Sequence, residues 1–347
     1  MRSRWLSLIL LMLGTAALAA ALATQLLLVP TTVRLPLEPD TDLTTESSDY
    51  SYLSFATGQV VEDIDAVTRS RARGDLSDPA VSEDVAVWAG GTVTTEADDD
   101  FLGAGEITVC LDRRTAEALP ECAANEINGE KVPIRGLVLI FPFGTEQRDY
   151  DLWDSPTEQT HPARFDGEEE VDGLGVYRFE VEIPETQIRT ADVPGAWVGS
   201  PEQASVEAAV LYAARRTLYV EPTSGLIIGS EDFSELRLQG PTGETVTLTS
   251  GTFRPTEETQ ANGVAAGTEL RDTIRSVSVV LPWTLAAIGV VLLVAGGLLL
   301  RRSVRRQTRT SPPEDLPGSA FSAPTAAVEP RTPLVTSRSG SAAGPPA

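Results

Sequence analysis

The 347-residue sequence has very few of the residues on which metal and redox chemistry depend. It contains one histidine, two cysteines and a single lysine, Lys131. One histidine and two cysteines are too few ligands for a Cys/His zinc site or a haem, so no metal and no cofactor is indicated. The net charge of −23 argues against a nucleic-acid partner, because phosphate recognition needs a basic face.

Catalytic patterns are also scarce. The only histidine, His161, precedes Pro162, and such a loop histidine is more often a surface residue than a general base. No glycine-rich phosphate loop occurs. The acidic runs 98–100 and 168–172 carry oxygen ligands suited to calcium, but they lack the spacing of a calcium loop and are more typical of solvated charge. We predict that the protein is not an enzyme.

What the sequence does have is two long uncharged runs, at residues 5–29 and 276–300. At about 1.5 Å per residue, each is long enough to cross a hydrocarbon core of roughly 30 Å as a transmembrane helix. Arginines cluster within residues 1–4 and 301–309. Because arginine clusters close to a span remain in the cytoplasm, we expect both termini inside and residues 30–275 outside, on the cell membrane.

The first run has an alternative interpretation as a signal peptide. Residues 17–19 and 21–23 are both Ala-Leu-Ala, which fits the small-residue pattern of a cleavage site. The apolar run continues to Val29, beyond the usual length of a signal core, and this favours a membrane helix. The central region is extracytoplasmic in both interpretations.

Residues 301–347 are first basic and then rich in Pro, Ser, Thr and Ala, with no hydrophobic period. Such a segment cannot bury enough apolar surface to offset its chain entropy. We expect a disordered cytoplasmic tail.

The central region, residues 30–275, has the pattern of an antiparallel sheet. Phe179, Val181 and Ile183 alternate with charged residues, as in a strand with one buried face, and residues 172–173 are a hairpin-type Asp-Gly. Further strands are expected at 84–88, 106–111, 137–142, 217–220, 226–228, 231–238 and 244–250. The predicted fold class is mainly β: an antiparallel meander, half-barrel-like, flanked by two transmembrane helices.

One helix is predicted to cap this sheet. Ser200 is a good N-cap, with Pro201 at the first helical position and Gln203 completing a capping box. An apolar stripe at helical spacing follows, formed by Val206, Ala209, Val210 and Ala213.

A faint internal repeat is also present. Residues 109–116 can be laid over residues 218–225, since each segment is a strand that ends in an acid and is followed by a turn. A duplication would divide the region into lobes at 45–135 and 136–256. Unrelated hairpins also look alike, so the repeat has this second explanation.

The two cysteines, Cys110 and Cys122, face an oxidising compartment in this topology. A lone pair there is most simply a disulfide, and the spacing is not the Cys-x-x-Cys of a redox-active pair. Closing this loop is expected to contribute roughly 3 kcal/mol through loop entropy.

Several segments together carry a family resemblance. The most specific are residues 141–146, Phe-Pro-Phe-Gly-Thr-Glu, and 150–154, Tyr-Asp-Leu-Trp-Asp. The others are residues 2–5, 136–140, 162–165, 167–173 and 217–225. Over roughly residues 1–303 the sequence resembles the actinobacterial porin PorA-like family of two-span envelope proteins, a domain of unknown function. The resemblance implies an actinobacterial membrane protein of the cell envelope and carries over no catalytic residue.

Four aromatic residues of these segments, Phe141, Phe143, Tyr150 and Trp153, have two interpretations. They form part of the core, or they line a cavity for an apolar ligand, with Trp153 near its mouth. Core packing is favoured, because buried aromatic residues are far commoner than ligand-lining ones.

Our hypothesis is a membrane-anchored cell-envelope protein whose β domain binds or transfers an apolar or lipidic envelope component. A curved meander with a capping helix is similar to lipoprotein-carrier half-barrels at the level of fold alone. The alternative is an interaction or scaffolding protein, within a pore-forming, porin-like envelope assembly. The expected partners are the lipid bilayer and either a lipid or another envelope protein.

Overall fold

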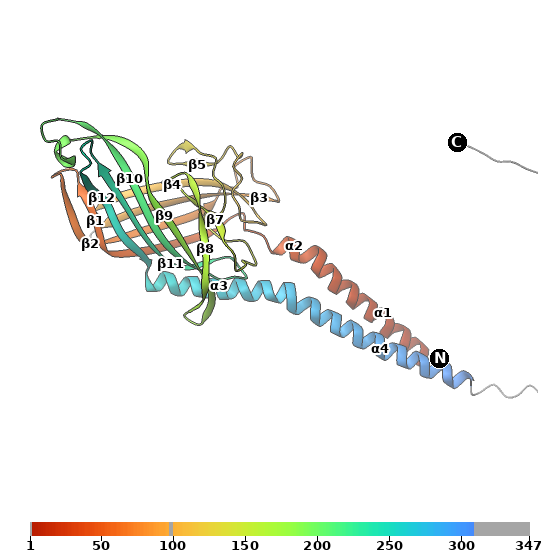
Figure 1. Cartoon of the computed structure of the whole chain (residues 1–347). Coiled ribbons are helices and arrows are strands. Elements are labelled where there is room, and N and C mark those ends of the chain that lie inside the picture. Colours follow the sequence, from red (N-terminus) through yellow and green to blue (C-terminus); the bar gives the residue numbers. More distant parts are fainter. Residues whose placement is uncertain (1, 97–99, 309–347) are drawn as a thin grey trace, which may run out of the picture.

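The computed structural model describes residues 2–96 and 100–308 as a curved β domain carried on two long helices (Figure 1). Most of the expected tail lies outside the described residues. The helical elements are α1 (Arg2–Ala23), η1 (Thr24–Leu28), α2 (Val29–Thr32), η2 (Gly195–Val198), α3 (Glu257–Arg275), η3 (Ser276–Val280) and α4 (Leu281–Thr308). The strands are β1 (Asp40–Ser54), β2 (Gln59–Gly74), β3 (Val85–Glu96), β4 (Phe101–Asp112), β5 (Glu126–Ile127), β6 (Glu130–Lys131), β7 (Tyr150–Asp154), β8 (Gln159–Val171), β9 (Leu174–Val193), β10 (Val206–Val220), β11 (Ile227–Gln239) and β12 (Thr245–Pro255).

These strands form one 12-stranded antiparallel sheet in the order β6-β5-β4-β3-β2-β1-β12-β11-β10-β9-β8-β7. It consists of two meanders, β1–β6 and β7–β12, which are joined where β1 pairs with β12. Phe179, Val181 and Ile183 of β9 are buried. The mainly β, antiparallel fold class predicted from this alternation is therefore confirmed. The meanders occupy nearly the residues of the two expected lobes, but one hydrophobic core extends across both.

The turns after β4 and β10, which the sequence overlay matched, have the same hydrogen bonds. In each, the carbonyl oxygen of the acid accepts a bond of 2.9 Å from the amide four residues later, at Ala116 and at Gly225. The side chains of these acids, Asp112 and Glu221, also each accept from the amide three residues later. The last turn residue has positive φ in both, 62° at Ala116 and 73° at Gly225.

A second pair of turns, after β1 and β7, extends this correspondence. Residues 49–59 and 149–159 share Asp, Tyr, Thr and Gln at equivalent positions. Their turns also contain a residue of positive φ at the same place, Gly58 at 70° and Glu158 at 53°. The two turn pairs relate β1 to β7 and β4 to β10, which is the same offset in strand order. A common offset is what duplication of one half would produce.

One end of the curved sheet is nearly closed into a barrel by the segment around Leu137. The bridging pairs are Leu111 with Ala118, Glu117 with Leu137, and Leu137 with Leu152. The strand expected at 137–142 is wrong, because the segment makes only these isolated bridges. Gly136 permits the close approach: its φ is 68°, and a Cβ there would lie 2.5 Å from the Asp151 carbonyl oxygen.

The helix expected after Ser200 is also wrong. Residues 201–204 form a turn, and Val206–Val220 is strand β10, between β9 and β11. The segment fits both periods, because Ala208 and Val210 are buried at the period of a strand. Pairing with a strand on each side outweighs the helical stripe, as tertiary context often does. The helix that does pack on the sheet is α3, from after the last strand.

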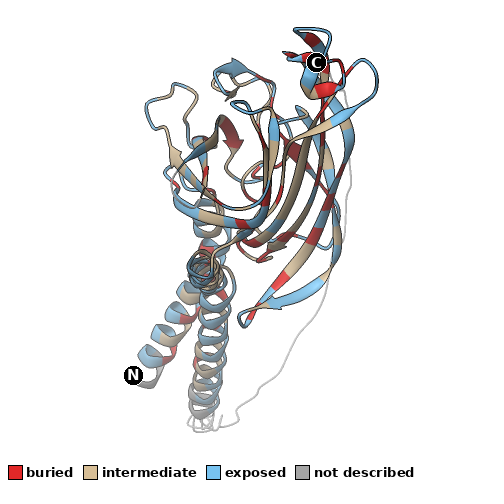
Figure 2. Ribbon diagram, turned by 90° about the vertical axis from the view of Figure 1, so that its left-hand side faces the viewer, coloured by how far each residue is buried: buried red, intermediate tan, exposed pale blue. Residues whose placement is uncertain are grey.

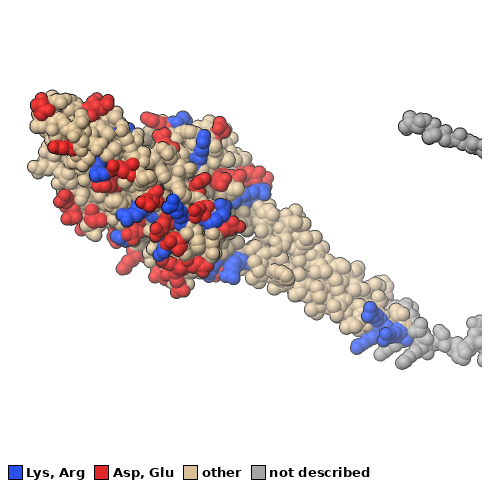
Figure 3. Space-filling view, viewed as in Figure 1, with Lys and Arg blue, Asp and Glu red and all other residues tan. Residues whose placement is uncertain are grey.

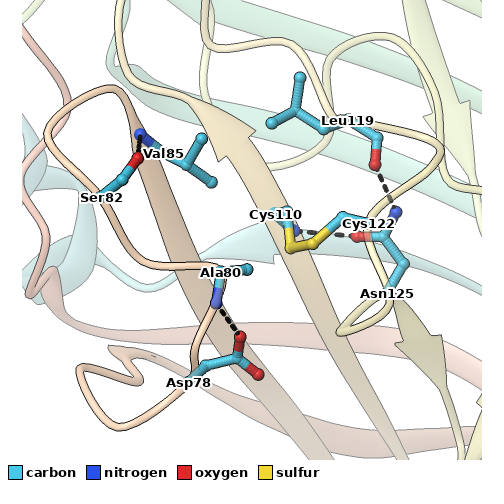
Figure 4. Close-up of a disulfide and its surroundings, with 8 residues drawn as sticks. All are labelled: Asp78, Ala80, Ser82, Val85, Cys110, Leu119, Cys122 and Asn125. Carbon is cyan, nitrogen blue, oxygen red and sulfur yellow. Dashed lines mark hydrogen bonds between the residues drawn. A yellow bond between two sulfur atoms is a disulfide. The ribbon is translucent and has the colours of Figure 1, made fainter.

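Cys110 of β4 and Cys122 form a disulfide, with a sequence separation of 12 (Figure 4). The side chain of Asn125, near the end of the same loop, makes two further contacts. Its side-chain oxygen accepts from the Cys110 amide at 2.9 Å, and its side-chain nitrogen donates to the Leu119 carbonyl oxygen at 2.8 Å. The disulfide and the hydrogen bond from the Cys110 amide therefore attach the loop to β4, while the bond to Leu119 joins two residues within the loop.

Replacing both cysteines by serine is expected to lower the free energy of unfolding by about 3 kcal/mol, because the unfolded chain regains the entropy of an open loop. The Asn125 bonds keep the folded loop in place. Guanidinium denaturation of the full-length protein, followed by tryptophan fluorescence, measures the change. Equal denaturation midpoints for the wild type and the Cys110→Ser/Cys122→Ser variant would contradict it.

The long helices have the length and apolar character of membrane spans, over Trp5–Thr32 and Glu257–Arg302. Large apolar side chains such as Leu8, Val291 and Leu298 are exposed on them. On the face shown in Figure 3, the helix pair has no charged side chain until a basic group near its far end. Exposed apolar surface of this extent indicates contact with lipid.

Helices α1 and α4 lie side by side as a hairpin (Figure 1). Glycine residues at the contact allow the two helices to approach each other closely. A Cβ on Gly14 would lie 2.8 Å from Leu293 Cγ, and a Cβ on Gly289 would lie 2.8 Å from Leu18 Cγ. Small residues at the crossing are typical of helices that associate within lipid.

Each long helix also contains a π-helical turn shortly before a proline. The turn η1 precedes Pro30, and η3 precedes Pro282. Proline has no amide hydrogen, and its ring clashes with the carbonyl group four residues earlier. A wider turn at that place relieves the clash, so both helices continue past their prolines.

Candidate ligand cavity

A cavity of about 850 Å³ lies inside the curved sheet. Its walls come from β1–β4, from the β10–β11 hairpin, from residues 138–143 and from α3. Figure 2 shows how strongly the sheet curves, with the helix pair extending away from the domain.

Small residues on the inward face of β1–β4 explain why the space is not filled. Two rows of cross-strand neighbours run across these strands and line the cavity. They are Thr41, Ala72, Gly90 and Ile107, and next to them Leu43, Ser70, Thr92 and Gly105. Glycine, alanine, serine and threonine cannot reach across a curved sheet, so the interior that larger side chains would fill remains open.

The facing wall is mostly apolar. It is formed by Leu218, Leu226, Ile227, Ile228, Val138, Leu139, Ile140, Phe143 and Leu270. Helix α3 closes this side by packing tightly on β11. A Cβ on Gly263 would lie 3.0 Å from the Ile228 carbonyl oxygen, and a Cβ on Gly267 would lie 2.6 Å from Ile228 Cδ1.

The cavity also adjoins both connections to the membrane-length helices. Pro36 and Pro39 line it and follow α2. Thr259 and Leu270 line it from α3, which continues through η3 into α4. The two segments that join the sheet to the helices are therefore also part of the cavity wall.

A buried ion-pair network lies beside the cavity and is centred on Asp154, whose side chain is 1% exposed. Its Oδ1 accepts from Arg216 Nη2 at 2.7 Å and from the Tyr212 hydroxyl at 3.3 Å. Its Oδ2 accepts from the Thr157 amide at 3.0 Å and the Thr157 hydroxyl at 2.7 Å. Four donors satisfy this carboxylate, as a buried charge requires.

Tyr212 remains a donor in this network at neutral pH. Burial raises the pKa of its hydroxyl to about 12, an effect that Arg216 opposes and the negative charge of Asp154 reinforces. The protonated hydroxyl can therefore donate to Asp154 throughout the physiological range.

Asp232 faces Arg216 across the β10–β11 pair and lines the cavity. It accepts from Ser230 Oγ at 2.8 Å, and its Oδ1 lies 3.7 Å from Arg216 Nε. Its side chain is 37% exposed, and because it shares the inward face with Arg216, this exposed surface faces the cavity. Burial raises the pKa of Asp232, while Arg216 and the Ser230 hydrogen bond oppose the rise.

His161 lies in strand β8, half-buried, and not in the surface loop that the sequence indicated. Its Nε2 is 3.1 Å from the Thr157 hydroxyl. The histidine thus contacts the same network through the residue that caps Asp154.

Three of the four aromatic residues considered as ligand contacts lie in the core. Phe141 is fully buried, with its ring centroid 4.8 Å from that of Phe179 and 5.4 Å from that of Tyr150. Trp153 is also buried, and its indole N–H has no acceptor among the described residues. Only Phe143, of these four, lines the cavity.

The acidic run at 168–172 is paired with neighbouring side chains. Arg178 forms ion pairs with two acids, one of them in the run, and Gln260 donates to Asp172 at 3.0 Å. Among the described residues no three His, Cys, Asp or Glu side chains are grouped to hold a metal. Of the other acidic run, 98–100, Asp98 and Asp99 lie outside the described residues.

The family model described as Porin PorA matches residues 6–298. The chain belongs to this family. The resemblance read from the sequence segments is thereby confirmed. Together with the two long apolar helices, membership places the protein in a membrane or the cell envelope.

Two curated relatives are each named Porin PorA. The protein from Corynebacterium resistens is 23% identical over 241 residues, which cover 50% of this chain and 57% of the relative. The protein from Corynebacterium amycolatum is 25% identical over 203 residues, which cover 46% and 53%. The chain spans about half the length of the curated relatives it matches. Neither name describes an enzyme.

Proposed function

We propose that this protein binds an apolar or lipidic component of the cell envelope in its cavity and exchanges it with the membrane. The observation that carries the proposal is the cavity itself. A volume of about 850 Å³ is within the range of ligand sites, and the wall is mostly apolar with a few polar groups. Apolar walls favour an alkyl chain over water.

In this proposal α1 and α4 cross the membrane, both termini are cytoplasmic, and residues 30–275 are extracytoplasmic. The arginines after Leu300 support this orientation. The disulfide supports it as well, since disulfides persist in oxidising compartments.

The route of exchange follows from the two segments that line the cavity and lead to the helices. A lipid leaves the outer leaflet beside α3, passes Leu270 and enters between α3 and the segment at Pro36. The outer surface of the β domain carries many charged side chains (Figure 3), so the interior offers the apolar path.

A photoactivatable lipid tests this route. With a diazirine on its acyl chain, it is expected to label residues 218–232 and 138–143 after irradiation of native membranes, because these residues form the apolar wall. Peptide mass spectrometry locates the label. The loop at residues 113–125, which does not line the cavity, is the internal control. Label confined to α1 and α4 would contradict the proposal.

A second candidate function is a subunit of a pore-forming assembly, which the name of the curated relatives favours. Two helices cannot enclose a channel by themselves, so such a pore would need several copies of the chain. Planar-bilayer recordings separate the candidates. Stepwise conductance by the purified protein, retained when the cavity is filled by mutation, would favour the pore.

A further inference from the structure

Asp232 is a charged residue in a cavity wall that is mostly apolar, and the buried Arg216 does not rely on it alone. Arg216 already has a buried partner in Asp154, at 2.7 Å. Its contact with Asp232 is looser, at 3.7 Å. Asp232 therefore retains acceptor capacity that its contacts with the protein do not use.

The surroundings of Asp232 leave acceptor sites open to the cavity. It receives one hydrogen bond from Ser230, and Ser230 also lines the cavity. Leu226, Ile227 and Ile228 precede them on the same hairpin. A carboxylate beside an apolar strip matches an amphiphile, with its chain on the strip and its polar end on Asp232.

The charge of the wall limits what that polar end can be. Asp40, Arg71 and Glu106 are among the lining residues, but each adjoins a residue of the inward rows, so its side chain points out of the cavity. Asp232 has its carboxylate on the inward face. Arg71 is already paired, since its Nε lies 2.6 Å from an Asp42 oxygen. In the network, two carboxylates share the single guanidinium of Arg216. An anionic head group would add a negative charge where two already share one positive charge.

We propose that Asp232, with Ser230, is the polar anchor of the cavity, and that it selects amphiphiles whose head group is uncharged and bears hydroxyl groups. The hydroxyls donate hydrogen bonds to Asp232, and the acyl chain packs along Leu226 to Ile228. The inference rests on the proposed binding function. It adds the chemical class of the ligand and the residue that recognises it.

Two probes with the same acyl chain test this selection, the uncharged 1-oleoylglycerol and anionic oleate. Isotope-labelled forms are bound at pH 8 to the full-length protein in nanodiscs of neutral phospholipid, with empty nanodiscs as the blank. The wild type is expected to bind 1-oleoylglycerol at least about tenfold more tightly than oleate. In Asp232→Asn, which removes the charge and keeps the shape, oleate binding is expected to strengthen about tenfold.

The matched control is Glu231→Gln, on the adjacent residue of β11. Glu231 lies on the opposite face and pairs with Arg254 at 2.6 Å, so its replacement changes the net charge equally without altering the cavity. It is expected to leave both affinities unchanged. Asp232→Ser, a second uncharged variant, repeats the test if Asp232→Asn does not fold.

The outcomes separate the two proposals. If both probes bind the wild type equally, or if Glu231→Gln strengthens oleate binding as much as Asp232→Asn, the anchor is wrong while the binding function stands. If neither probe binds above the blank, both proposals fail. Selectivity for 1-oleoylglycerol that is lost only in the Asp232 variants supports the anchor.

Discussion

Filling the cavity with Ala72→Phe and Thr92→Phe is expected to reduce the binding of 1-oleoylglycerol at least tenfold, a loss of about 1.4 kcal/mol in binding free energy. Ala72 and Thr92 lie in the adjacent inward rows that leave the interior open. Two aromatic rings there occupy the space of an acyl chain. Stability should change little, because the new rings enter an existing space and displace no packed side chain.

Its control places the same two rings on the outside. Ala89 and Val93 lie on β3 on either side of the inward Gly90 and Thr92, and both are exposed. The Ala89→Phe/Val93→Phe variant is expected to bind the probe like the wild type. Equal binding by the filled and control variants would show that the ligand lies elsewhere.

Removing Asp154 is expected to have the largest effect on stability. In Asp154→Ala, Arg216 loses its close buried partner, and the amide and hydroxyl groups of Thr157 lose the carboxylate oxygen to which they donate. Breaking a buried ion pair by removing one partner costs about 3–5 kcal/mol, because the remaining charge is left unpaired. A drop of this size would unfold much of a domain of ordinary stability, and guanidinium denaturation measures it.

An exposed ion pair provides the comparison. Glu169 pairs with Arg178 on the surface of the domain, and its side chain is 37% exposed. Glu169→Ala is expected to cost less than about 1 kcal/mol, because exposed pairs are screened by water and salt. If the Asp154 and Glu169 variants lost equal stability, the buried network would not have the structural role assigned to it.

Much of the fold could be predicted because it rests on local patterns. The alternation at Phe179, Val181 and Ile183 requires one buried face, and the Asp-Gly at 172–173 forms the β8–β9 hairpin with φ of 47° and 85°. The long helices could be predicted from the uncharged runs in the same way. Both the alternation and the apolar runs are features of local sequence, which is sufficient to predict strands and helices of this kind.

The ion-pair network was missed because of the error at residues 206–213. Read as a strand, the segment places Arg216 on the inward face between Ala214 and Leu218, both buried. A charged residue on the apolar face of a strand is a signal for a buried partner. Read as a helix, the same segment gives Arg216 no inward position, so the sequence pattern does not indicate a buried partner.

The cavity could not be predicted for a different reason. Ala72, Gly90 and Gly105 come from three strands, and only the pairing register places them in two adjacent rows. In the sequence, each of these small residues has local explanations, such as a bulge or a bend. The cavity exists because the side chains at these positions are too small to fill the interior. Predicting it therefore requires the strand pairing of the whole curved sheet.

The most direct test of ligand binding is the lipid carried by the protein from its own membrane. The wild type and the Ala72→Phe/Thr92→Phe variant are purified in parallel, and their lipids are extracted and measured by mass spectrometry per mole of folded protein. The account predicts about one uncharged amphiphile per wild-type chain and at least tenfold less in the variant, with equal amounts of membrane phospholipid in both. The same lipids in the same amounts in both samples would contradict it.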